Sequence, residues 1–176
     1  MKKTTFLLLL ISICFVSERL QAQESTEKEA KNSISISLGH THVIKGVRDG
    51  KNQWLALPSW AIDYNRELNE SWYVGLHNEI ITEDFEVKSA KEEVIERTFP
   101  VSMVAVVGFR PKEYLSFIVG GGAEWAEEET FQVIRLGVEP AFPISDYMEL
   151  VIGAMYDFKI NAYNSWSISF GVARKF

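Results

Sequence analysis

Three histidines, His40, His42 and His77, are the residues of this 176-residue sequence with most potential for chemistry. His40 and His42 are two positions apart, so in an extended segment both side chains point to one side and could provide two ligands of a metal site. His77 has no obvious place beside them, and no Gly-rich phosphate loop, cysteine cluster or HExxH motif accompanies them. We therefore predict no metal site and no cofactor, and we interpret His40 and His42 as interfacial polar residues.

Nucleophilic catalysis requires a base within hydrogen-bond reach of a hydroxyl or thiol group. Outer-membrane lipid deacylases use a His/Ser pair with an acid, but this sequence contains no His-x-Ser, and His40-Thr41-His42 is a poor substitute. A lipid-modifying enzyme stays an alternative only if one histidine lies beside both a hydroxyl group and an acid. We predict that the chain is not an enzyme.

Composition and the N-terminus indicate the class of protein. The chain is 47% hydrophobic and 12% aromatic with a net charge of −6, which excludes a disordered segment and disfavours a nucleic-acid partner. A basic start is followed by an apolar run over residues 5–16, shorter than the roughly 20 residues of a spanning helix, and by Ala22. This layout predicts a cleaved signal peptide over residues 1–22. The polar residues 23–32 then form a flexible charged leader.

From Ser33 onward the hydrophobic period is two, which is the signal of β-strands. The first segment places Ile34, Ile36 and Leu38 on one side, and serines alternate with them on the other. Eight such segments follow one another over residues 33–176. They predict an all-β, eight-stranded antiparallel up-and-down barrel.

The connections vary in length, and some residues fit the barrel poorly. We expect two longer, charged external loops at Ile44–Gln53 and Thr82–Glu93. The fourth strand is expected to start at Glu96, with its carboxylate inward and Arg97 on the lipid side. Three prolines fall inside predicted strands, where a closed sheet needs every N–H group, so we expect β-bulges beside them. These prolines are Pro58, Pro100 and Pro140.

The two sides of the predicted strands differ in a way that decides which side faces inward. One side is almost wholly large and apolar with aromatic residues near the strand ends, and the other is Gly, Ser and Ala with isolated charges. A narrow eight-stranded barrel has room inside only for small residues and a few ion pairs, whereas a lipid-facing exterior requires the apolar side. We therefore predict a transmembrane barrel. The alternative is a soluble exported barrel that binds a small apolar ligand inside.

With this pattern the sequence resembles the small eight-stranded outer-membrane proteins of the OmpA-transmembrane-domain and OmpX type, and its leader resembles small barrels of Bacteroidetes-type bacteria. The last strand resembles the assembly signal of that class at Trp166, Phe170 and Phe176. The resemblance implies insertion in a bacterial outer membrane by the barrel-assembly machinery. It also implies contact with membrane lipids and lipopolysaccharide, a monomeric state, and a structural or interaction role.

The predicted inward side carries charges that must be paired or hydrated. We expect Arg135 to anchor a central ion network by reaching Glu124 or Glu139, and Glu149 to lie near Lys175. A plugged lumen is favoured over a narrow pore because eight strands leave an interior that side chains fill. The predicted network comprises Arg135, Glu124, Glu139, Glu149, Lys175, Glu79, Asp157 and Lys159.

Overall fold

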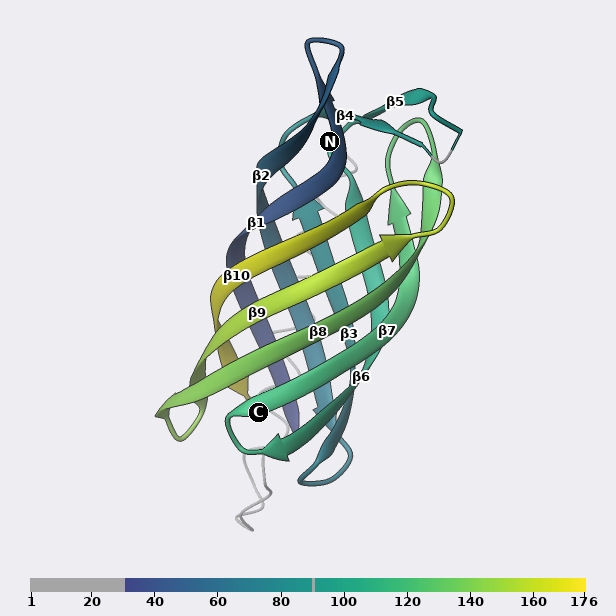
Figure 1. Cartoon of the computed structure of the whole chain (residues 1–176). Coiled ribbons are helices and arrows are strands. Elements are labelled where there is room, and N and C mark those ends of the chain that lie inside the picture. The colour runs from purple at the N-terminus through teal and green to yellow at the C-terminus, as the bar shows by residue number, and fades with distance from the viewer. Residues whose placement is uncertain (1–30, 90) are drawn as a thin grey trace, which may run out of the picture.

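The structure, a computed structural model, describes residues 31–89 and 91–176, and this part of the chain is almost entirely β-structure (Figure 1). The predicted signal peptide and all but the end of the predicted leader lie outside the described residues. No helix in the described part is long and apolar enough to cross a membrane. The strands are β1 (Asn32–Arg48), β2 (Lys51–Glu67), β3 (Trp72–Ile81), β4 (Phe85–Lys88), β5 (Val94–Arg97), β6 (Val101–Lys112), β7 (Leu115–Trp125), β8 (Thr130–Ser145), β9 (Met148–Lys159) and β10 (Asn164–Lys175).

Eight of these strands form a closed antiparallel barrel. Their order is β1-β2-β3-β6-β7-β8-β9-β10, and β10 pairs with β1 to close the sheet. Closure leaves no sheet edge, which is the condition for a sheet to exist in lipid. The prediction of an eight-stranded antiparallel barrel is confirmed. Strands β4 and β5 form an additional hairpin outside the barrel wall, which we call the plug hairpin.

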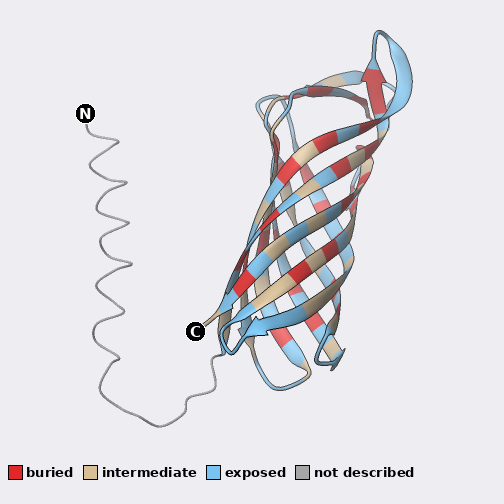
Figure 2. Cartoon of the chain, turned by 90° about the vertical axis from the view of Figure 1, so that its left-hand side faces the viewer, coloured by how far each residue is buried: buried red, intermediate tan, exposed pale blue. Residues whose placement is uncertain are grey.

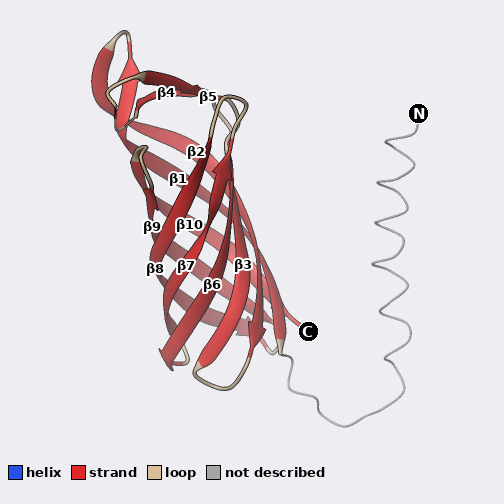
Figure 3. Cartoon of the chain, turned by 90° about the vertical axis from the view of Figure 1, so that its right-hand side faces the viewer, coloured by secondary structure: helices blue, strands red, loops and turns tan. Residues whose placement is uncertain are grey.

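The barrel has two unlike ends. The terminal end carries Asn32, Phe176 and the short turns that follow β2, β6 and β8. The loop end carries the β1–β2 hairpin, the plug hairpin and the connections that follow β7 and β9 (Figures 1 and 3). The prediction of a long loop over residues 44–53 is wrong, because β1 and β2 extend through these residues to a two-residue turn. Asp49 and Gly50 both have positive φ (53° and 70°), as a tight hairpin of this twist requires.

The apolar side of the strands faces outward. Ile34, Ile36 and Leu38 are about half exposed, whereas Ser35 and Ser37 between them are buried. The same alternation of buried and exposed residues runs along the barrel strands (Figure 2). This orientation matches a wall that faces lipid. It contradicts the alternative of an apolar ligand pocket lined by the same residues.

The bulges expected at the prolines are absent from the described strands. Pro58 keeps its register opposite His40, and its carbonyl accepts the N–H of Thr82, just where β3 ends. Pro140 keeps its register opposite Leu115, and Pro100 precedes β6 rather than lying within it. The register shifts instead fall at Val43/Gly46, Phe109/Lys112 and Pro143/Ser145.

The predicted start of the fourth barrel strand at Glu96 is also wrong. Glu96 and Arg97 belong to β5, and the barrel strand begins at Val101. Glu96 is exposed on the plug hairpin instead of facing the lumen. Pro100 lies between β5 and β6. Because it has no N–H group to donate to a strand ladder, it separates the two strands.

Candidate functional site

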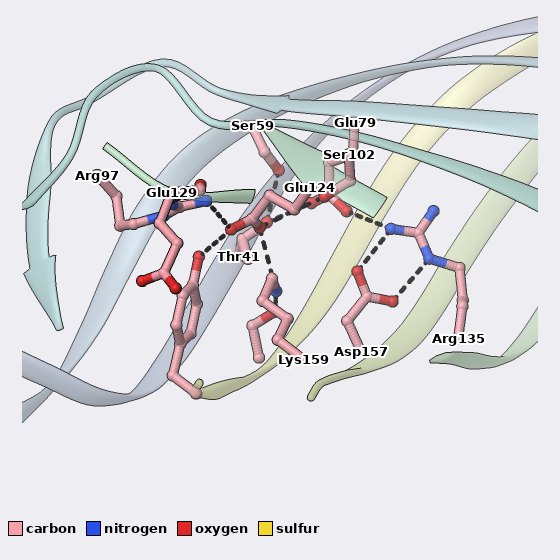
Figure 4. A network of polar contacts seen from close by, with 12 residues as sticks. Thr41, Ser59, Glu79, Arg97, Ser102, Glu124, Glu129, Arg135, Asp157 and Lys159 are labelled. Atoms are coloured by element: carbon pink, nitrogen blue, oxygen red, sulfur yellow. Dashed lines mark hydrogen bonds and ion pairs between the residues drawn. The ribbon is translucent and has the colours of Figure 1, made fainter. Parts of the chain in front are cut away.

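The carboxylate of Glu124 on β7 is the centre of a buried polar cluster near the loop end (Figure 4). It accepts hydrogen bonds from Arg97 Nη2 (2.8 Å), the Tyr163 hydroxyl (2.6 Å) and the Ser102 hydroxyl (3.4 Å). Lys159 Nζ lies 3.3 Å from Oε2 of the same carboxylate. Glu124 is 1% exposed, and such a buried charge is stable only with this density of partners.

Arg97 reaches this cluster from the plug hairpin, outside the barrel wall. The residue is fully buried, which overturns its predicted place on the lipid side. Its Nη1 donates to the backbone carbonyl of Glu129 (2.5 Å), and its guanidinium lies over the ring of Phe131, 4.6 Å from the centroid. These contacts hold β5 against the connection between β7 and β8 and against the start of β8.

Arg135 on β8 forms a second polar layer deeper in the lumen. Its Nε and Nη2 donate to the two carboxylate oxygens of Asp157 at 2.7 Å each, and Nη2 also donates to Glu79 at 3.1 Å. Asp157 is the direct register partner of Arg135, whereas Glu79 comes from β3, on a different part of the wall. The Thr41 hydroxyl donates to Glu79 and accepts a hydrogen bond from the Ser59 hydroxyl (3.0 Å), which ties β1 and β2 to the same layer.

The structure brings the predicted network residues together in groups other than the one expected. In the described part of the chain, Arg135 forms no hydrogen bond or ion pair with Glu124 or Glu139. Lys175 and Glu149 form an ion pair of 2.6 Å at the terminal end, apart from both layers. Glu139 lies between these groups, and within residues 31–89 and 91–176 it has no ion pair.

Little space is left between these groups. Below the Arg135 layer, Asp63 accepts hydrogen bonds from Ser35 (3.4 Å) and from the N–H of Asn78 (3.1 Å). A cavity of about 20 Å³ lies here, bordered by Asp63, Glu79, Arg135 and Glu139, among others. A cavity of this size holds about one water molecule. The lumen is therefore filled at this level.

An apolar cluster closes the loop end above the Glu124 layer. Phe85 and Val87 of the plug hairpin are buried among residues of the barrel wall and of the turn before β10. Figure 3 shows the hairpin lying across this end of the barrel. We call the barrel side of this contact the cup, which consists of Val43, Leu55, Leu57, Ile81, Phe131 and Tyr163.

Tyr163 belongs to both the cup and the polar layer beneath it. Its ring meets those of Phe85 and Phe131 edge to face, while its hydroxyl donates to Glu124. Burial and the neighbouring Glu124 carboxylate raise the pKa of the Tyr163 phenol well above its usual value. The phenol is therefore a fixed hydrogen-bond donor at neutral pH.

The histidines are not assembled into a catalytic or metal site. His42 lies on the outer face and stacks on Trp166 with ring centroids 3.9 Å apart, and His40 is exposed on the same face. His77 is buried in the lumen, where its Nε2 lies 3.1 Å from the amide oxygen of Asn65. Within residues 31–89 and 91–176, no group of three or more His, Cys, Asp or Glu side chains could hold a metal ion.

Comparison with known proteins identifies the fold. No family model matches the sequence, and no curated protein matches it. Among solved structures, Ail, the attachment invasion locus protein of Yersinia pestis, in complex with the heparin analogue sucrose octasulfate, is 18% identical. It has a TM-score of 0.57, with 85% of this chain and 100% of that one covered. OprG of Pseudomonas aeruginosa (9% identity, TM-score 0.56, 84% and 97% covered) and Neisserial surface protein A (14%, 0.52, 85% and 100%) are also similar. At these identities the likeness shows the fold alone.

Proposed function

Because the chain has the closed eight-stranded fold of outer-membrane proteins such as Ail and OprG, we propose that it is a non-enzymatic integral protein of a bacterial outer membrane. Its role is structural or interactive. It acts through its lipid-facing wall and its loop-end surface rather than by conducting solutes. The predicted signal peptide over residues 1–22 provides its export.

The observation that carries this proposal is the opposite chemistry of the two sides of the wall. Outward side chains such as Leu38 and Phe170 are apolar and about half exposed, as a surface solvated by acyl chains requires. Inside, two ion layers cross the lumen, and the cavity beside Arg135 measures only about 20 Å³, too small for a continuous water column at that level. An apolar exterior around a filled polar interior supports a sealed membrane barrel.

The wall also supports the proposed partners. Trp166, Phe170 and Phe176 all lie on the outward side of the last strand or at its end, where the barrel-assembly machinery could read them as a linear signal. Membrane lipids and lipopolysaccharide are the proposed neighbours of this wall, and the chain is proposed to be monomeric.

The histidine geometry gives no support to a lipid-modifying enzyme. Such an enzyme needs a base beside both a hydroxyl group and an acid. In the described part of the chain, His77 is bonded to an amide, and His42 is stacked on an indole ring. Replacing His42 by alanine should leave the lipid A mass profile of the membrane unchanged.

Two measurements test the proposed function. Cells that produce the full chain are fractionated, and the outer-membrane fraction is run on a gel with and without boiling. We expect the protein in that fraction, with a band that shifts on heating. Purified protein in planar bilayers should give no stable unitary conductance. Recovery of the protein from the periplasmic fluid would overturn the membrane assignment, and steady conductance steps would overturn the sealed lumen.

A further inference from the structure

The plug hairpin is attached to the barrel by a short strand pairing and by buried side chains. β4 pairs with β1 at only two positions, Gly46↔Val87 and Val47↔Glu86. Phe85 and Val87 fill the cup, and Arg97 enters the polar layer at Glu124. A two-position ladder is short compared with the 11 positions that pair β1 with β10. The hairpin is thus held mainly by what its side chains bury.

The backbone at one root of the hairpin is strained. Phe99, between β5 and β6, has φ = 41° although it has a β-carbon and is half exposed. Its N–H donates to Asp84 at the other root of the hairpin, with a distance of 3.3 Å. Positive φ at a bulky residue has a conformational cost, which is relieved when the roots separate.

Glu124 keeps partners when Arg97 is withdrawn. Lys159 Nζ at 3.3 Å and the Tyr163 hydroxyl at 2.6 Å both come from the barrel itself. Removing Arg97 therefore leaves no isolated buried carboxylate, the situation that makes the breaking of most buried ion pairs prohibitive. Arg97 in turn would enter water beside the acidic connection that contains Glu127, Glu128 and Glu129.

The side chains that occupy the cup indicate what else it would accept. The cup takes the phenyl ring of Phe85 and the branched side chain of Val87, and its floor takes a guanidinium on Glu124 and on the face of Phe131. An apolar group joined to one cation reproduces both features. An anion of the same shape would meet the carboxylate without a counter-charge.

We propose that the cup is a binding site for a small amphipathic cation, in particular an alkyl guanidinium or alkyl ammonium, and that the plug hairpin occupies this site in the absence of ligand. The ligand enters from the loop end as Phe85, Val87 and Arg97 leave. The ion layer around Arg135 stays in place beneath it, so binding does not open a channel.

Competition with the hairpin sets the observed affinity. A ligand that binds only the vacated cup has an apparent dissociation constant equal to its intrinsic value divided by the fraction of open molecules. Weakening the hairpin must therefore tighten binding, and fixing it must abolish binding. The proposal is tested on the purified barrel. It can therefore fail while the membrane location and the sealed lumen hold, and these can fail while ligand binding holds.

The test uses octylguanidinium as the probe and titration calorimetry of the full mature chain in lipid nanodiscs, with empty nanodiscs as the blank. In Val47→Cys/Glu86→Cys, two register partners are joined so that a disulfide fixes β4 to β1. We expect no binding to the oxidised form and wild-type binding after reduction of the same polypeptide. Arg97→Met keeps an apolar side chain without the competing charge and should bind at least 10-fold more tightly than wild type.

Two further comparisons test the charge of the site. In the Arg97→Met background, where the hairpin no longer pairs with Glu124, Glu124→Gln should weaken octylguanidinium binding at least 10-fold. Glu149→Gln in the same background changes the lysine-paired carboxylate at the opposite end and should not alter binding. Octyl sulfate, with the same chain and the opposite charge, should not bind above the blank. Equal binding to the oxidised and reduced double variant, or equal binding of octyl sulfate, would overturn the proposal.

Discussion

Arg97 and Glu124 form a fully buried ion pair, with 2.8 Å between Nη2 and Oε1, although one residue lies on an accessory hairpin and the other on the barrel wall. The pair joins the part of the molecule that closes the loop end to the part that forms the lumen. On the barrel side, Glu124 is also bound by Lys159 and Tyr163. Replacing Arg97 should therefore expose the plug hairpin more than breaking any ion pair at the terminal end does.

Replacing Arg97 by methionine should release the plug hairpin without unfolding the barrel. Limited trypsin digestion at Lys88 and Lys91, both on this hairpin, should accelerate at least several-fold, because local opening precedes cleavage. Arg110→Met, which breaks the Arg110–Glu67 pair at the opposite end, is the matched control and should leave the rate unchanged. Equal acceleration in both variants would mean that the barrel as a whole is loosened.

Replacing Arg135 by alanine should destabilise the barrel far more than any exposed ion pair does. The change leaves Asp157 and Glu79 buried with their shared cation removed, which costs about 3–5 kcal/mol. Urea unfolding in lipid vesicles, followed by tryptophan fluorescence, measures it. Lys88→Ala breaks the partly exposed Lys88–Glu92 pair and should cost less than about 1 kcal/mol. Similar losses for both would show that the lumen is hydrated.

The two buried tyrosines offer a comparison within one chain. Tyr163 donates to Glu124 at 2.6 Å, whereas the buried Tyr73 hydroxyl has no hydrogen-bond partner among the described residues. Tyr163→Phe should therefore cost about 1.5–3 kcal/mol, the range for hydrogen bonds to charged groups, and Tyr73→Phe should be neutral or stabilising. The same vesicle assay measures both losses of stability. A larger loss for Tyr73→Phe than for Tyr163→Phe would indicate that a water molecule binds the Tyr73 hydroxyl.

The raised pKa of Tyr163 predicts a loss of stability in alkali. The unfolded phenol ionises near its usual pKa of about 10, while the folded one keeps its proton to higher pH. Stability due to this group is thus fully present below pH 10 and falls as the pH rises above that value. Tyr163→Phe should flatten this part of the stability profile relative to wild type, when unfolding is measured between about pH 9 and pH 11. An unchanged slope would assign the alkaline loss to other groups.

The barrel itself could be predicted from the sequence because its information is local. The alternation of Ile34, Ser35 and Ile36 fixes both strand type and side, and an eight-stranded barrel leaves only one side for small residues. Glu149 could be placed near Lys175 because a hairpin register needs only strand limits and a turn.

The partners of Arg135 and Arg97 could not be predicted in this way. Glu79 reaches Arg135 across the lumen from a strand that does not neighbour β8, so the contact exists only after the barrel has closed. Arg97 follows the same alternating pattern as a barrel strand but belongs to the plug hairpin. Pro100, which separates β5 from β6, is the signal in the sequence that one strand ends and another begins there.

Charge placed on the outer wall gives the most direct test of where the lipid lies. Leu136, near the middle of β8, is 46% exposed on the apolar side, so Leu136→Arg should destabilise the barrel by about 2–4 kcal/mol in a bilayer. Ile144→Arg adds the same charge at the end of β8, where an arginine reaches the head groups and should cost about 0–1 kcal/mol. Unfolding in vesicles compares the two. If both variants unfold at the same urea concentration as wild type, the wall does not face lipid at Leu136.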